Sequence, residues 1–196
     1  MKSSSSLWNL CRVIASQPRL GLLHLLAEAG ELCVSEVQSR SGMSRTNASN
    51  QLKTLCAYGM ISFRRKDMNV IYRAEPVFPD SVAAHLLEAI KACFLQEVQF
   101  SEIVRSATGF SHGRRIEVTR AIGNAGGNFE MIQKKTGMSR SALFRHLDKL
   151  ERRGFISHEA DVYNMNSPEN VFAKALLDAV LSNRKSTVGL YRKGDK

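Results

Sequence analysis

The sequence GMSRTNASNQLKTLCAYGMIS, residues 42–62, is followed 95 positions later by GMSRSALFRHLDKLERRGFIS, residues 137–157. Both stretches open with Gly-Met-Ser-Arg and end with Ile-Ser, and the matching residues keep the same offset without a gap. A fixed offset over this length is typical of a structural unit that occurs twice in a chain. Between those ends, the shared positions are Leu52 and Leu147, Leu55 and Leu150, and Gly59 and Gly154.

Each copy predicts a helix capped by a serine, Ser44 in the first and Ser139 in the second. Apolar residues then recur at helical spacing and define an inward face. A shorter helix that ends at Gly42 precedes the first copy, and residues 61–64 and 70–73 alternate as paired strands do. Helix, turn, helix and hairpin form a winged helix-turn-helix. The inward positions are Ala48, Leu52 and Leu55, and then Leu143, Leu147 and Leu150.

Amphipathic stretches flank both units, at residues 7–15 and 81–94 around the first and at 96–107 and 175–180 around the second. We therefore predict a mostly α fold with small β-hairpin wings, in which two tandem winged helix-turn-helix domains carry flanking helices. The leading helices match through Leu7, Leu10, Cys11 and Arg12 against Phe100, Ile103, Val104 and Arg105. The predicted boundaries are 1–95 for the first unit, 96–184 for the second, and 185–196 for a basic, disordered tail.

The chain has 196 residues, a hydrophobic content of 43%, and a net charge of +10 from 28 Lys and Arg against 18 Asp and Glu. This length allows two domains of about 100 residues each. The positive charge favours a polyanionic partner, nucleic acid first and an anionic membrane surface second. No apolar run approaches the roughly 18 residues that span a bilayer, and no secretion signal is recognised. We therefore expect a cytoplasmic protein with reduced thiols and no membrane partner.

The outward faces of the two capped helices carry side chains suited to double-stranded DNA. Amide side chains can pair with adenine, and arginine with guanine, in the major groove. Hydroxyl groups at a helix N-terminus suit phosphates, as do basic residues in the first hairpin turn, whereas Glu159 and Asp161 in the second turn would repel them. The predicted DNA-binding residues are Ser44, Arg45, Thr46, Asn47, Asn50, Gln51, Lys53, Arg64, Arg65, Lys66, Ser139, Arg140, Ser141, Arg145, His146 and Lys149.

Several short motifs carry a family resemblance: Leu25-Leu26-Ala27-Glu28, Gly30-Glu31-Leu32-Cys33-Val34, Leu52-Lys53-Thr54-Leu55 and Val70-Ile71-Tyr72-Arg73. With them, residues 18–76 resemble the winged-helix domain of ArsR/SmtB-like transcriptional regulators. The second unit is similar through residues 137–156, where Ser141-Ala142-Leu143-Phe144-Arg145-His146-Leu147 resembles the recognition helix of the family. The resemblance implies a repressor that binds operator DNA as a homodimer through its terminal helices.

We therefore expect a sequence-specific DNA-binding regulator, with repression as its mode, in which two fused units form a pseudo-dimer within one chain. Two independently tethered domains, or a further dimer of chains, are the alternatives for its assembly. A second function class also stays open, because Phe144 falls on the exposed face of the second recognition helix. That class is a tandem winged-helix protein-interaction module of a chromosome-organising or replication complex.

The resemblance also raises the question of a metal sensor. Family members that sense arsenite carry Cys-Val-Cys where this chain has Cys33-Val34-Ser35, so one thiolate is missing. His85 and Glu88 fit the end of the family's zinc motif but lack its upstream partners. We therefore expect no metal and no cofactor. We also expect no enzyme, because the sequence shows no phosphate-binding glycine loop and no arguable Ser-His-Asp arrangement.

Overall fold

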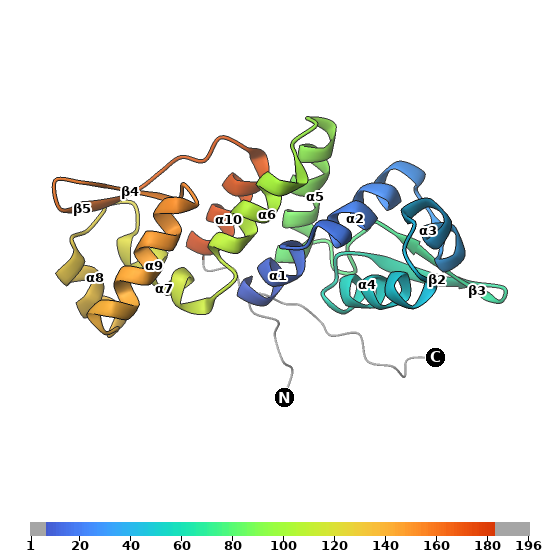
Figure 1. Ribbon diagram of the computed structural model, residues 1–196, viewed down its shortest axis with the longest axis horizontal. Coiled ribbons are helices and arrows are strands. Elements are labelled where there is room, and N and C mark those ends of the chain that lie inside the picture. Colours follow the sequence, from blue (N-terminus) through green and yellow to red (C-terminus); the bar gives the residue numbers. More distant parts are fainter. Residues whose placement is uncertain (1–6, 183–196) are drawn as a thin grey trace.

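The structure, a computed structural model, describes residues 7–182, so the predicted tail at 185–196 lies outside the described residues (Figure 1). The first half contains five helices and a small sheet, and the capped helix of the first repeated stretch is the fourth of them, α4. Its elements are α1 (Leu7–Ile14), α2 (Gln17–Ala29), β1 (Leu32–Cys33), α3 (Val34–Ser41), α4 (Arg45–Ala57), β2 (Ser62–Lys66), β3 (Asn69–Arg73) and α5 (Val82–Leu95).

The second half has the same order of helices, with the second capped helix as α9, and its hairpin is shorter. The described chain is thus mostly helical with two small antiparallel sheets, as the sequence predicts. No helix within residues 7–182 is long and apolar enough to cross a membrane. The elements are α6 (Phe100–Gly109), α7 (Gly113–Ile122), α8 (Phe129–Thr136), α9 (Arg140–Arg152), β4 (Ile156–Glu159), β5 (Val162–Met165) and α10 (Val171–Leu181).

The first sheet has the order β1-β3-β2, and its hairpin is longer than predicted. Arg65 pairs with Val70 and Lys66 with Asn69, so the prediction that these two basic residues lie in the turn is wrong. The turn itself is formed after Lys66, with Asp67 at a positive φ of 53°. Because strand pairing continues to the end of the hairpin, Arg65 and Lys66 are held on a regular strand near its tip.

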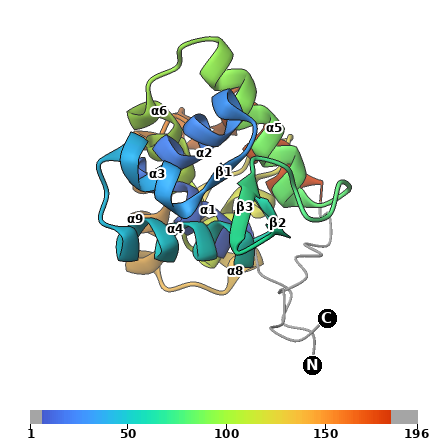
Figure 2. The same cartoon turned by 90° about the vertical axis from the view of Figure 1, so that its right-hand side faces the viewer.

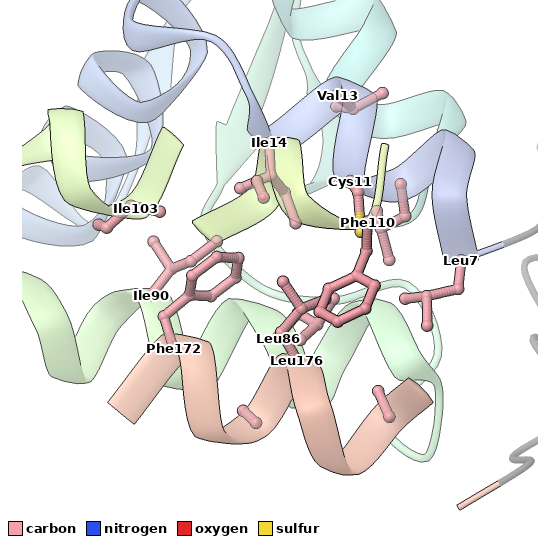
Figure 3. Close-up of a cluster of buried hydrophobic side chains, with 14 of the residues drawn as sticks. Leu7, Cys11, Val13, Ile14, Leu86, Ile90, Ile103, Phe110, Phe172 and Leu176 are labelled. Carbon is pink, nitrogen blue, oxygen red and sulfur yellow. The ribbon is translucent and has the colours of Figure 1, made fainter. Parts of the chain in front are cut away.

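The centre of the molecule is a layer of four helices drawn from both halves. α5 packs along α10, and α1 packs on α6. Ile90 of α5, Ile103 of α6 and Phe172 of α10 are fully buried and lie together in Figure 3. These side chains belong to one continuous hydrophobic cluster that includes core residues of both halves. The two halves therefore share a core rather than being joined by a linker alone.

Corresponding arginines fix the junctions between the first two helices of each half. Arg19 Nε donates to the carbonyl of Val13 at 2.6 Å, and Arg115 Nε donates to that of Gly109 at 2.5 Å. The corresponding residues, Arg19 with Arg115 and Val13 with Gly109, are each 96 positions apart in the sequence. The predicted match of Leu7 with Phe100 instead uses an offset of 93. That match is therefore wrong by about one helical turn, an error that arises because an apolar stripe looks alike at i and i+3.

The molecule is elongated, with the four-helix layer in the middle and a winged part at each end (Figure 1). α4 and α9 both lie toward the lower side in Figure 1 and again after the 90° rotation of Figure 2. The two capped helices therefore lie on the same side of the molecule, with the central helices between them.

Candidate DNA interface

The first capped helix, α4, is fixed by its cap and by its inward face. Ser44 Oγ accepts a hydrogen bond from the backbone N–H of Asn47 at 3.3 Å. The inward residues Ala48, Leu52 and Leu55 are fully buried, as predicted. The opposite face is therefore presented to solvent, and the predicted residues on it that are exposed are Ser44, Arg45, Thr46, Asn47, Asn50 and Lys53.

Gln51 differs from its neighbours on α4 because its side chain is half-buried and already engaged. Its Oε1 accepts from Arg19 Nη1 at 2.9 Å, and its Nε2 donates to Asn47 Oδ1 at 3.2 Å. The amide thus connects the capped helix to the start of α2. The structure places Gln51 as a support for Asn47 rather than as a free group on the open face.

The basic residues of the first hairpin divide into two kinds. Arg64 donates to both carboxylate oxygens of Glu31, at 3.0 and 2.9 Å, and Arg73 bonds the same carboxylate. These bonds from Arg64, with those from Arg73, lower the pKa of Glu31 to about 2. Arg65 and Lys66 are exposed and form no ion pair among the described residues. The unneutralised positive charge of this hairpin therefore lies on Arg65 and Lys66, at its tip.

The second capped helix, α9, repeats the cap, since Ser139 Oγ accepts from the backbone N–H of Ala142 at 3.4 Å. Arg140 lies over the ring of Phe129 at 5.0 Å, which orients its guanidinium. Arg145 and Ser141 are exposed, and Arg145 Nε donates to the carbonyl of Ser141 at 3.3 Å. These residues form an open polar face like that of α4.

Phe144 stands in the middle of this open face, and 62% of its surface is exposed. Its position in the first copy is Ser49, which is only half-exposed. The two faces therefore differ in chemistry, because α4 presents amide, hydroxyl and basic groups whereas α9 adds a large apolar ring.

His146 and Lys149 are less exposed than their predicted place on the outward face of α9 requires. The imidazole of His146 lies 5.0 Å from that of His112, before the start of α7. Burial, followed by the nearby charges of Arg153 and Arg115, lowers the pKa of Lys149. Both side chains thus turn toward α7 rather than sharing the open face with Arg145, because helical spacing carries them around the helix.

Sequence reasoning missed the residues that meet them, His112, Arg114 and Arg115. The signal available in the sequence was a pair of arginines at the start of a helix, immediately after a histidine and a glycine. Such a run reads as an ordinary solvated helix start unless a second element is known to pack beside it.

The second hairpin carries opposite charge from the first. Glu159 and Asp161 are exposed, and Asp161 lies in the turn at a positive φ of 65°. Asp161 also lies 3.9 Å from His158 Nε2. Asp161 lies in the turn as predicted, whereas Glu159 pairs with Val162 at the end of β4, so the prediction that Glu159 lies in the turn is wrong. Both carboxylates are nevertheless near the tip of this hairpin.

The residues around Cys33 do not fit a thiolate site for arsenite. Cys33 Sγ lies 2.9 Å from Ser35 Oγ, and the other three cysteines are buried. Burial raises the pKa of Cys56 to about 12, so that thiol stays protonated. Within residues 7–182, no group of three or more His, Cys, Asp or Glu side chains is placed to hold a metal ion. Glu88, which with His85 fits only the end of the family's zinc motif, accepts a hydrogen bond from Lys91 Nζ at 2.9 Å.

Comparison with known proteins agrees with this geometry. Residues 16–62 match the family model described as bacterial regulatory protein, arsR family. Over 90 residues, the chain is 32% identical to the arsenical resistance operon repressor of Escherichia coli. The aligned residues make up 46% of this chain and 76% of that relative. It is 33% identical over 81 residues to the arsenic resistance transcriptional regulator ArsR1 of Pseudomonas putida, covering 41% and 63% of the two chains. No solved structure matches.

Proposed function

This chain belongs to the bacterial ArsR family of transcriptional regulators, and we propose that it is a sequence-specific repressor whose two winged-helix units act as a pseudo-dimer. ArsR-type regulators bind DNA through the helix-turn-helix, which here lies in residues 16–62. Both relatives are named for control of arsenic resistance, one of them as a repressor. We infer repression from the name of that relative, whereas we infer the arrangement of the two units from the structure of this chain.

The observation that carries the pseudo-dimer is the shared central layer. The family resemblance implies a dimer interface built from terminal helices, and here α5 packs along α10 while α1 packs on α6. The buried side chains of Ile90 and Phe172 meet in that layer (Figure 3). Because the pairing is intramolecular, it does not depend on protein concentration.

The placement of α4 and α9 on one side supports their joint use on one duplex (Figures 1 and 2). Successive turns of the major groove are about 34 Å apart along DNA, and two recognition helices of one regulator occupy such a pair. Asn50 of α4 suits adenine, and Arg145 of α9 suits guanine. Since the two open faces differ, the operator is expected to have two unlike half-sites.

The remaining predicted residues divide by chemistry. Ser44 and Ser139 lie at helix N-termini, where hydroxyl and free N–H groups suit phosphates. Arg65 and Lys66 are the exposed cations of the first wing that form no ion pair among the described residues, and they suit the backbone or the minor groove. These contacts would set register and affinity, while Asn50 and Arg145 would select the sequence.

The experiment is selection from a random duplex library, followed by binding measurements on the enriched site and on a shuffled duplex. Asn50→Ala and Arg145→Ala should each lose about 1–3 kcal/mol on the enriched site and little on the shuffled one. Lys174→Ala, an exposed position on α10, is the matched control. If no motif is enriched, or if both variants bind both duplexes as the wild type does, then Asn50 and Arg145 do not read bases.

A protein-interaction module is the second candidate, because Phe144 is 62% exposed on α9. A large apolar ring on an open face is a common anchor of protein interfaces. The library selection separates the two readings. A wild-type chain that enriches no sequence, and whose affinity for random DNA is unmoved by salt, would favour the interaction module.

A further inference from the structure

A cluster of six cationic or protonatable side chains lies where the N-terminus of α7 meets the C-terminal half of α9. Burial, then the charges of His112 and Arg115, lowers the pKa of His146. Lys149 likewise lies within the fields of Arg153 and Arg115. We call this group the α7–α9 basic cluster, and it consists of His112, Arg114, Arg115, His146, Lys149 and Arg153.

Hydrogen bonds to the end of α6 hold two arginines of the cluster in place. Arg115 donates to the carbonyls of Gly109, at 2.5 Å, and Thr108, at 3.0 Å. Arg153 Nε donates to Thr108 Oγ1 at 2.8 Å. These bonds use groups at the end of α6, so the two guanidinium groups are positioned by the same turn of chain. The geometry is therefore preorganised rather than a chance meeting of long surface side chains.

The positive charges of the cluster are largely uncompensated. Within residues 7–182, Arg114 is the one member that pairs with a carboxylate, that of Glu117 at 2.7 Å. Asp148 faces Lys149 from the same helix, but its carboxylate pairs with Arg152. Like charges held together without counter-charges disfavour their own protonated forms. A bound polyanion would offset that cost.

The first unit does not repeat this cluster. At an offset of 95, Gln51, Thr54 and Tyr58 stand where the second unit has His146, Lys149 and Arg153. At the offset of 96 set by the two junction arginines, Pro18 stands for Arg114. The first unit instead has a basic wing, and the wing of the second is acidic. The first unit thus carries exposed positive charge on its wing, whereas the second unit carries it at the junction of α7 and α9.

We propose that the α7–α9 basic cluster is a phosphate-binding site through which the second unit grips the DNA backbone in place of its wing. This inference rests on the proposed function and names where one half of the regulator holds its duplex. α9 lies on the same side of the molecule as α4 (Figures 1 and 2), and α7, which carries part of the cluster, packs against α9. We therefore expect a duplex that meets both capped helices to pass close to this junction. The ligand is the phosphodiester backbone, which is read without regard to sequence.

The imidazole of His146, 5.0 Å from that of His112, makes this grip dependent on pH. His146 faces His112, Arg115 and Arg114 from the α7 side and Arg145 from its own helix, all of which oppose its protonation in the free protein. Two carboxylates lie near these groups, and both are already paired: Glu117 with Arg114 and Asp148 with Arg152. A phosphate beside His146 favours the imidazolium form of that residue, so DNA binding takes up a proton and strengthens as pH falls from about 8 to 6.

The first test uses the full chain and a random duplex, with salt varied between about 50 and 200 mM. Lys149→Ala and Arg114→Ala should each lower the slope of log affinity against log salt by about one, and weaken binding roughly fivefold at 0.15 M salt. Lys174→Ala, the control on α10, should leave the slope unchanged. Circular dichroism confirms that each variant is folded. A wild type with a steep slope and two cluster variants that share it would overturn the inference while leaving the proposed function standing.

The second test replaces His146 by glutamine, the residue that the first unit has at this position. The wild type should bind random duplex more tightly as pH falls from 8 to 6, and His146→Gln should flatten that dependence while keeping a steep salt slope. A wild-type affinity that does not change over this range would contradict the role of His146. A wild type that binds no duplex at all would overturn both this inference and the proposed function.

Discussion

Truncating Phe172 tests whether the two halves share one core. Its ring is fully buried in α10, beside Ile90 of α5 and Ile103 of α6 (Figure 3). Phe→Ala at a buried site costs about 3–5 kcal/mol, a large part of the roughly 5–15 kcal/mol that stabilises a typical domain. With a urea slope of about 2.5 kcal/mol per molar, a loss of about 4 kcal/mol moves the midpoint down by about 1.5 M.

The assay follows unfolding of the opposite half. Hydrogen exchange at Leu52 and Leu55 reports on α4, which packs on α2 and α3 and belongs to the first half. If the core is shared, Phe172→Ala should lower protection at those amides together with the loss of total helix signal. Lys174→Ala, an exposed change on the same helix, should stay within about 0.5 kcal/mol of wild type. Unaltered protection in α4 beside a destabilised second half would refute a shared core.

Three further predictions concern single positions. Gly109→Ala should lower the melting temperature by about 3–9 °C, because the added Cβ would lie 2.6 Å from the buried ring of Phe155; an unchanged melting curve would show that the ring moves freely. Glu31→Gln should release Arg64 and steepen the salt dependence of DNA binding by about one; a slope equal to wild type would place Arg64 away from DNA. Cys33→Ser should leave DNA affinity with and without arsenite unchanged, because a single thiolate is a poor ligand set; arsenite-driven release of DNA that this change abolishes would contradict that reasoning.

Features that depend on local sequence were predicted well. Ser44 and Ser139 cap their helices as expected, since the cap bond reaches only three residues along the chain. The inward faces of α4 and α9 were also correct, because helical spacing alone fixes which side chains share a face. The acidic tip of the second hairpin, with Asp161 in its turn, follows from the same local reading.

Features that depend on packing between distant segments were not predicted from the sequence. Lys149 and Arg115 are 34 positions apart, and nothing in the period of either helix shows that they share a field. The pairing of Arg64 with Glu31 likewise joins positions 33 residues apart. For this reason the sequence analysis counted Arg64 among the residues available to DNA and did not single out the residues at the start of α7. Tertiary contacts decide which charged groups are neutralised and which remain available.

In the proposed pseudo-dimer, one chain supplies both halves of a DNA-binding pair. The most direct test is the mass of the complex formed on the enriched operator, measured in solution with DNA in slight excess. We predict one chain of 21.8 kDa per duplex, with a footprint of two unlike half-sites about one helical turn apart. Two chains per duplex on a palindromic footprint would contradict the pseudo-dimer and indicate a homodimer of chains.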